Sequence, residues 1–265
     1  MEEDIIFSLW NLIVGLVLFC AIGFNLYRYR LLEKRRRLFQ QLAMELGSTV
    51  DDPRQKPDGN ITGIPDTSRW GKIVMTIIIF VVRVFGPQVS LVRSELLGVM
   101  SNLSLFTGFK SMRIENLIIK DSKDARVYLF EGSWKSKTNR TYNRTGFAAK
   151  DARFDFPEFT VVPEDFAKKA TKLLGSLGVG DKDIKIEFDP EFSESYFVTG
   201  AEEHRVREVL NAGTCRWFMT NKAKGLHFES NGPSFVIYVE KKSLDIETIR
   251  ALYLAGDEFL QMWEH

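Results

Sequence analysis

The sequence is short of the residues from which most active sites and cofactor sites are built. Its 265 residues include three histidines, and none has a partner at the spacing of a metal site. No G-x-S-x-G turn is present. Gly175, Gly178 and Gly180 follow a helical pattern instead of opening one, so they do not form a phosphate loop. We therefore expect no catalytic residues, no metal ligands and no cofactor.

Cysteine and net charge are also scarce. Cys20 lies in an apolar run and Cys215 lies far downstream, so no disulfide framework is expected. The 36 Lys and Arg residues against 35 Asp and Glu residues leave a net charge of +1. Proteins that bind nucleic acid need a clear excess of positive charge, so we expect no nucleic-acid partner. The 45% hydrophobic content is ordinary for a chain that buries a core.

The longest uncharged stretch lies near the N-terminus. Residues 5–26 contain no Asp, Glu, Lys or Arg, and a helix of about 20 apolar residues crosses a bilayer core. The acidic start at residues 2–4 and the lack of a cleavage site argue against a signal peptide. We expect a transmembrane helix that continues to about residue 46 and ends at Gly47.

A basic cluster follows this stretch. It consists of Arg28, Arg30, Lys34, Arg35, Arg36 and Arg37. Positive charge beside a membrane helix stays in the cytoplasm, so we expect the N-terminus outside and residue 28 onward inside, in a cell membrane or, in a Gram-negative cell, the inner membrane. The cluster is either a plain topology signal or a contact for anionic lipid head groups, and membrane lipid is the expected partner.

A second apolar stretch leaves the topology of the remaining chain open. Residues 51–69 are rich in Pro, Gly and Asp and predict a loop. Residues 73–92 are rich in Ile and Val but contain Arg83 and Pro87. This stretch is a second membrane span, a buried strand or a half-inserted segment. The C-terminal domain is cytoplasmic with one span and extracytoplasmic with two.

The last part of the chain alternates strand and helix patterns. Strands are expected at 111–120, 125–134, 146–156, 159–162, 184–188, 196–199, 226–230 and 234–240, and helices at 163–177, 202–212 and 246–263. The fold class is therefore α+β, with an N-terminal transmembrane helix followed by a mostly antiparallel sheet domain with packed helices. We divide the chain into an anchor with its basic extension (1–47), a linker with the second apolar stretch (48–92) and a soluble domain (93–265).

Several short motifs are shared with a known layout. They are Leu105-Phe106-Thr107-Gly108, Val127-Tyr128-Leu129-Phe130, Pro157-Glu158-Phe159 with Pro163-Glu164, and Phe188-Asp189-Pro190-Glu191-Phe192-Ser193 with Tyr196, Gly200-Ala201-Glu202-Glu203 and Val206-Arg207. The chain resembles a broad group of uncharacterised bacterial membrane-anchored proteins with one N-terminal helix and a single α+β domain. The resemblance implies that layout over residues 93–265 and the anchor, and no catalytic residues. The apolar insert at 70–92 departs from it.

A polar, basic hairpin loop is expected at residues 135–144. With the preceding residue it carries Trp134, Lys135, Lys137, Arg140, Tyr142 and Arg144. Basic residues interleaved with aromatics suit lipid head groups or single-stranded nucleic acid. A solvated hairpin tip is the simpler interpretation. We retain these residues as a candidate surface for a ligand or partner.

An acidic cluster surrounds the strand expected at 184–188. Its members are Asp181, Asp183, Glu187, Asp189, Glu191 and Glu194. Paired carboxylates can act as acid and base, but most such clusters are solvated or cap helices. Cys215 stands in an apolar stretch and is expected to be a buried, inert thiol.

Three functional hypotheses follow. The first is a membrane-tethered, non-enzymatic module that binds a membrane or envelope protein or helps to assemble a complex. The second is a membrane-anchored hydrolase that uses the acidic cluster near Asp189 and Glu191, which requires its carboxylates to converge in a pocket. The third is a lipid-surface sensor that uses the basic cluster and the hairpin. The sequence indicates no oligomeric state.

Overall fold

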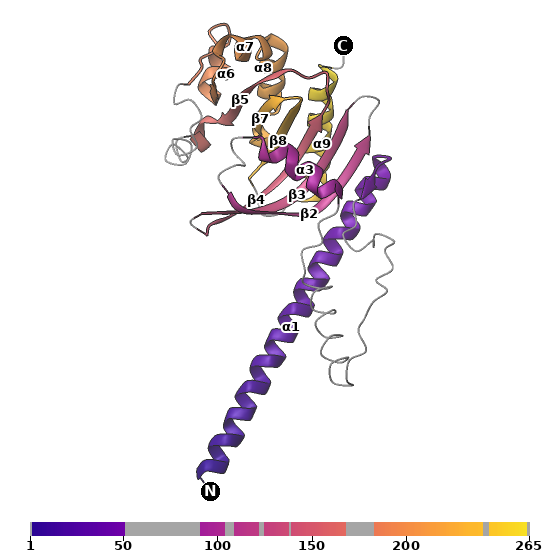
Figure 1. Cartoon of the computed structure of the whole chain (residues 1–265), viewed down its shortest axis with the longest axis vertical. Coiled ribbons are helices and arrows are strands. Elements are labelled where there is room, and N and C mark those ends of the chain that lie inside the picture. The colour runs from indigo at the N-terminus through magenta and orange to yellow at the C-terminus, as the bar shows by residue number, and fades with distance from the viewer. Residues whose placement is uncertain are drawn as a thin grey trace, which may run out of the picture.

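The computed structural model of the chain describes residues 2–50, 91–103, 109–121, 125–137, 139–167, 183–240 and 244–263. In the first helix, side chains before residue 29 are described only at positions 20, 23, 24, 26 and 27. The described residues confirm the α+β class, because helices cover an antiparallel sheet of eight strands (Figure 1).

The sheet interleaves strands that are distant in sequence. Its strands are β1 (Thr49–Val50), β2 (Phe109–Asp121), β3 (Arg126–Ser136), β4 (Thr141–Lys150), β5 (Phe156–Pro163), β6 (Tyr196–Gly200), β7 (His227–Gly232) and β8 (Ser234–Val239). Their order is β1-β2-β3-β4-β8-β7-β5-β6, and every neighbouring pair is antiparallel. The β7–β8 hairpin thus lies between β4 and β5, and it joins the two halves of the sheet.

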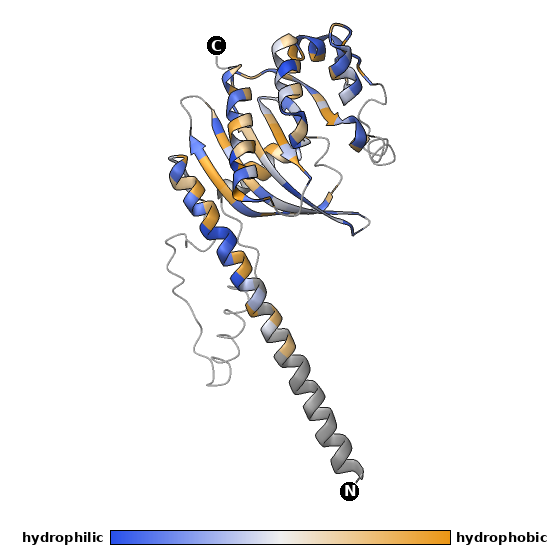
Figure 2. Cartoon of the chain, turned by 180° about the vertical axis from the view of Figure 1, so that it is seen from behind, coloured by the Kyte–Doolittle hydropathy of each residue, from blue (hydrophilic) through white to orange (hydrophobic). Residues whose placement is uncertain are grey.

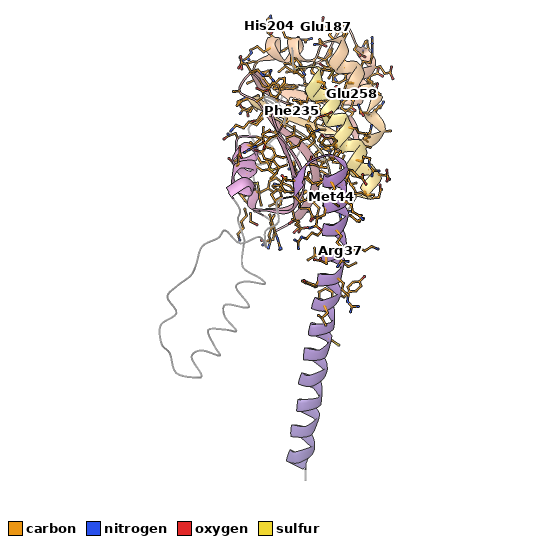
Figure 3. The ribbon with its side chains drawn as sticks, turned by 90° about the vertical axis from the view of Figure 1, so that its right-hand side faces the viewer. Arg37, Met44, Glu187, His204, Phe235 and Glu258 are labelled. Atoms are coloured by element: carbon orange, nitrogen blue, oxygen red, sulfur yellow. The ribbon has the colours of Figure 1, made fainter. Side chains whose placement is uncertain are left out.

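Helices pack on both faces of the sheet. They are α1 (Glu2–Glu45), α3 (Leu91–Ser101), α6 (Pro190–Ser195), α7 (Glu203–Val209), α8 (Ala212–Thr220), the 3-10 turn η1 (Lys222–Lys224) and α9 (Ile246–Gln261). One apolar core lies between the sheet and α9, the end of α1 and the α6–α8 region, and includes Phe235 (Figure 3). A second core lies between the sheet and α3. The faces of one sheet therefore support two separate cores.

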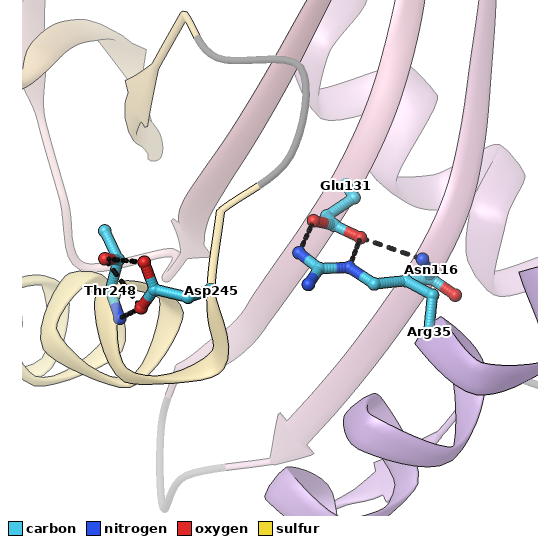
Figure 4. A network of polar contacts seen from close by, with 5 residues as sticks. All are labelled: Arg35, Asn116, Glu131, Asp245 and Thr248. Carbon is cyan, nitrogen blue, oxygen red and sulfur yellow. Dashed lines mark hydrogen bonds and ion pairs between the residues drawn. The ribbon is translucent and has the colours of Figure 1, made fainter. Parts of the chain in front are cut away.

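Helix α9 begins at a side-chain cap. The carboxylate of Asp245 accepts hydrogen bonds from the Thr248 backbone N–H at 2.7 Å and from its hydroxyl at 2.9 Å (Figure 4). Such a cap satisfies a backbone donor that the first helical turn leaves unpaired. From this start, Ile249, Leu252 and Phe259 are buried against the sheet. The expected final helix is confirmed.

The C-terminal part of α1 belongs to the folded domain. Phe39 and Leu42 are fully buried in the first core. Gly47, at φ +61°, ends the helix, as expected: the Ser48 N–H reaches the Ala43 carbonyl at 2.8 Å and the Gly47 N–H reaches that of Met44 at 3.2 Å. Strand β1 follows at once and pairs with β2. The segment assigned from sequence to the anchor thus shares a core with the C-terminal domain, and the first residues of the expected linker share its sheet.

The other part of α1 extends away from the domain as one continuous helix (Figure 1). The whole of α1, with 44 residues, is about 66 Å long at 1.5 Å per residue. Among the helices as far as their residues are described, none meets both the length and the apolarity needed to cross a membrane.

Three sequence expectations for the domain are wrong, and each has a local cause. The loop expected at 135–144 is mostly strand, because Trp134 pairs with Tyr142, β3 ends only at Ser136 and β4 begins at Thr141. The strand expected at 184–188 is absent, since the chain turns at 187–188 to enter α6. The helix expected at 202–212 stops at Val209, and Asn211 caps a new helix by accepting from the Thr214 N–H at 3.1 Å.

Two further expectations can be only partly compared with the structure. The helix expected at 163–177 is observed at residues 164–167, and its remainder lies outside the described residues. The proposed second span at 73–92, with Arg83, also lies outside them apart from the first residues of α3, which the sequence did not predict.

Gly256 gives a prediction about the packing of α9 on the sheet. A Cβ at this position would lie 2.3 Å from Cγ of the buried Phe147 ring. Alanine normally stabilises a helix interior by about 0.5–1 kcal/mol over glycine. Here the cost of the clash with Phe147 should exceed this gain in helix stability. We therefore expect Gly256→Ala to lower the free energy of unfolding by about 1–3 kcal/mol.

The matched control is Gly98→Ala in α3, where no described atom outside its own helix lies within 4 Å. This change should raise the free energy of unfolding by about 0.5–1 kcal/mol. Both variants are compared by urea unfolding of the full chain in mild detergent. If Gly256→Ala also stabilised the chain, the close contact between α9 and Phe147 would be refuted.

Candidate functional site

The basic cluster of α1 divides into an inward and an outward group. Arg35 points to the sheet, where its Nε donates to Glu131 Oε2 at 3.0 Å and its Nη2 donates to Oε1 (Figure 4). Asn116 Nδ2 donates to the same Oε2 at 2.9 Å. The Arg35 and Glu131 side chains are only 17% and 12% exposed. This two-bond ion pair therefore links α1 to β3 and β2 and is structural.

The outward group remains available to solvent or to a surface. Arg30 and Lys34 are exposed. Arg37 lies 3.6 Å from Glu33, yet its side chain is 74% exposed, and it projects from α1 just below the domain (Figure 3). Arg36 lies 3.8 Å from Glu33 and is largely covered. The side chain of Arg28 lies outside the described residues.

The hairpin candidates divide in the same way. Trp134 is fully buried, and Arg144 is 3% exposed. Arg144 Nη2 donates to Glu240 at 2.9 Å. Its guanidinium lies over the Tyr238 ring at 4.6 Å and the Trp134 ring at 5.7 Å. Such a cation over aromatic faces is a core element. Neither Trp134 nor Arg144 can serve as a free surface for a ligand.

The remaining hairpin residues do face outward. Lys135, Lys137 and Arg140 are exposed, and Tyr142 is half-buried against Phe109 with ring centroids 5.6 Å apart. The alternation of a strand explains the division, because Trp134 and Lys135 must point to opposite faces. Reading residues 135–144 as loop concealed this alternation.

Asp189 and Glu191 of the acidic cluster have separate environments. Asp189 caps α6 by accepting from the Phe192 N–H at 3.0 Å. Glu191 is exposed, and Asp183 accepts from the Val198 N–H at 3.2 Å. An open cavity of about 500 Å³ beside α6 includes neither Asp189 nor Glu191 in its lining, which consists of two other members of the cluster, Glu187 and Glu194, with Glu164, Lys185, Ile186, Pro190 and Ser193. Asp181 lies outside the described residues. The two carboxylates of the hydrolase hypothesis have local structural roles or face solvent.

Cys215 is a buried thiol, as expected. It has no exposed surface, and its Sγ contacts the Leu210 carbonyl at 3.5 Å. Burial raises the pKa of Cys215 to about 12, so the neighbouring Arg216 does not activate it. Across the described ranges, no three His, Cys, Asp or Glu side chains gather closely enough to hold a metal ion.

Sequence reasoning missed the two acidic partners that fix this region. Glu131 and Glu240 each lie 96 positions from the arginine they bind. The signal for Glu131 was present, because this carboxylate interrupts the apolar pattern of residues 127–130. No comparable signal marks Glu240, since only the β4–β8 pairing brings it to Arg144.

His227 is a buried histidine that gives a pH prediction. Its ring stacks on Tyr238 with centroids 4.9 Å apart and meets the edge of Phe166 at 4.4 Å. Burial, helped by the positive charge of Arg144, lowers the pKa of His227 from 6.5 to about 3. Between these pH values His227 is protonated in the unfolded chain and neutral in the folded chain. Folding stability should therefore fall as the pH drops through this window, by up to about 1.4 kcal/mol per unit.

The test is urea unfolding of the wild type and His227→Gln across this pH range. We expect the variant to lose most of the pH dependence between about 6 and 4. The control His204→Gln, at a side chain that is 86% exposed, should retain it. Arg153 lowers the pKa of Asp151, so the contribution of that carboxylate to the pH dependence of stability falls at more acidic pH. It is the same in all variants. An unchanged slope in His227→Gln would contradict the buried, neutral imidazole.

No protein-family model matches this chain, and no curated protein matches it. The resemblance to bacterial membrane-anchored proteins therefore stays a prediction.

Proposed function

We propose that this chain is a membrane-tethered, non-enzymatic binding or assembly module, with residues 5–26 of α1 as its anchor. The observation that supports the anchor most is the exposed apolar surface of α1 at the end of that uncharged stretch and just beyond it. Phe24, Leu26 and Tyr27 are about 60% exposed, and Tyr29 and Leu31 about half exposed. Apolar residues on the free part of α1 appear in orange in Figure 2. Tyrosines between an apolar run and a basic cluster are typical of the membrane interface.

The packing of α1 supports a single side for the basic cluster and the domain. Arg35 binds Glu131, Phe39 lies in the core, and β1 pairs with β2. A membrane cannot separate residues that share a core and a sheet. We therefore propose that the chain between β1 and β2 crosses the membrane an even number of times or not at all. The positive-inside rule then favours a cytoplasmic domain.

A binding role agrees better with the geometry than a hydrolase does. Asp189 caps a helix and Glu191 faces solvent, so these carboxylates do not converge as acid and base would. The exposed basic residues around the end of α1 offer an interaction surface instead.

The anchor is tested by substitution in the full chain. Leu16→Arg with Val17→Arg places two charges in the apolar run, each costing about 2.5–3.5 kcal/mol in a bilayer centre. We expect the wild type to resist alkaline carbonate extraction from membranes and the double variant to be released. Leu31→Arg with Leu32→Arg, beyond the run, is the control and should stay in the membrane. Release of the wild type would refute the anchor.

The binding role is tested on the same membranes. Native electrophoresis of gentle detergent extracts should show the chain in a species larger than the purified protein. Migration at the position of the purified protein, in membranes from cells at normal expression, would contradict a role in binding or assembly.

A further inference from the structure

Two rows of side chains extend the sheet face beyond the contact with α1. Residues two apart on a strand share a face, so Ser133 and Lys135 lie on the face of Glu131, which binds Arg35. The register places Arg113 and Asn143 beside Ser133, and Ser111 and Thr141 beside Lys135. Each row lies about 7 Å further toward the hairpin tip. Arg113 and Lys135 are exposed.

The hairpin tip continues this surface. Lys137 and Arg140 are exposed, and Asn139 takes the left-handed conformation at φ +61° that a tight turn needs. Residues 109–113 and 133–144 contain no Asp or Glu. We name Arg113, Lys135, Lys137 and Arg140 the basic rim.

The basic rim and the outward group of α1 lie at the same end of the molecule. The β3–β4 tip is at the end of the domain from which α1 leaves (Figure 1), and Arg37 lies at the same end, opposite His204 and Glu187 (Figure 3). Glu131 is already paired with Arg35, and Glu33, which lies 3.6 Å from Arg37 and 3.8 Å from Arg36, offsets part of the charge of the outward group. Exposed Glu115 is a further acidic residue on β2.

We propose that the basic rim, together with Arg30, Lys34 and Arg37, docks the domain on anionic phospholipid head groups of the leaflet next to α1. The inference rests on the proposed function, because α1 must first hold the domain near a membrane. A chain of net charge +1 that places seven exposed cations at the end of the domain next to an anchor is suited to a surface that is itself negative. Lys and Arg donate several hydrogen bonds to phosphate oxygens.

The experiment uses the full chain in vesicles. Cys20→Ser with Thr141→Cys provides one accessible thiol for a donor dye, because Cys215 is buried. Vesicles of phosphatidylcholine, with or without phosphatidylserine, carry an acceptor dye on a head group. Energy transfer should rise with phosphatidylserine and fall at high salt. Lys135→Glu, Lys137→Glu and Arg140→Glu together should abolish the rise, since each cation near an anionic surface is worth roughly fivefold in binding.

The matched control reverses three exposed cations away from the rim: Lys150→Glu, Arg216→Glu and Lys222→Glu. It should keep the full rise in transfer. Equal transfer in neutral and anionic vesicles, or equal effects of the two triple variants, would overturn the lipid contact while the chain still floats with the vesicles. A wild-type chain that does not float with vesicles would instead refute the proposed anchor.

Discussion

Replacing Phe39 with alanine should destabilise the C-terminal domain by about 3–5 kcal/mol, although Phe39 lies in the helix that carries the anchor. The ring is fully buried, and it belongs to the core formed by Ile118, Val127 and Leu129 of β2 and β3. Its removal costs the transfer energy of the ring and leaves a cavity that the rigid sheet cannot fill. The measurement is urea unfolding of the full chain in mild detergent.

The control for this change is Leu31→Ala, two helical turns earlier, where the side chain is 50% exposed. It should alter the free energy of unfolding by less than about 0.5 kcal/mol. An equally small effect of Phe39→Ala would mean that α1 is merely attached to the domain. The argument that places the domain and the basic cluster on one side of a membrane would then fail.

The second large effect is expected at Arg144. Arg144→Ala should lower the free energy of unfolding by about 2–4 kcal/mol, because it leaves Glu240 without its cation and opens a gap between aromatic rings. Glu240 is 20% exposed and can be partly rehydrated, which reduces the cost from that of a fully buried pair. Arg144→Lys should recover only part of the loss, since lysine lacks the planar group that stacks on Tyr238.

Arg140→Ala on the same hairpin is the control and should stay within about 0.5 kcal/mol of the wild type. Thermal and urea unfolding in mild detergent give the comparison. If Arg144→Ala and Arg140→Ala had the same small effect, Arg144 would be a surface residue, as the sequence had led us to expect.

Much of the sheet follows from local patterns. Alternating apolar residues located β2, β3, β6, β7 and β8, and a helical apolar face located α9. These elements are predictable because their periodicity reflects one buried and one exposed face. The basic hairpin lacks this apolar periodicity, since its strand residues are mostly polar where that face of the sheet extends beyond α9. Polar composition there reflects an uncovered sheet face and not a loop.

The candidate site was predictable only as a region. The basic cluster and the hairpin both proved to carry exposed cations, but Arg35 and Arg144 turn inward to Glu131 and Glu240. Nothing within a few residues of either arginine identifies its acidic partner, because contacts over long sequence separations bring them together. The packing of α1 on the sheet brings Arg35 to Glu131, and the pairing of β4 with β8 brings Arg144 to Glu240.

The central claim is that α1 anchors the chain and that the domain lies on the side of the basic cluster. The most direct measurement attaches two reporters, in parallel, after His265: one active only in the cytoplasm and one active only outside it. We predict activity of the cytoplasmic reporter alone. Activity of the extracytoplasmic reporter alone would place the basic cluster and the domain on opposite sides, or the whole chain in the reverse orientation, and would contradict the account.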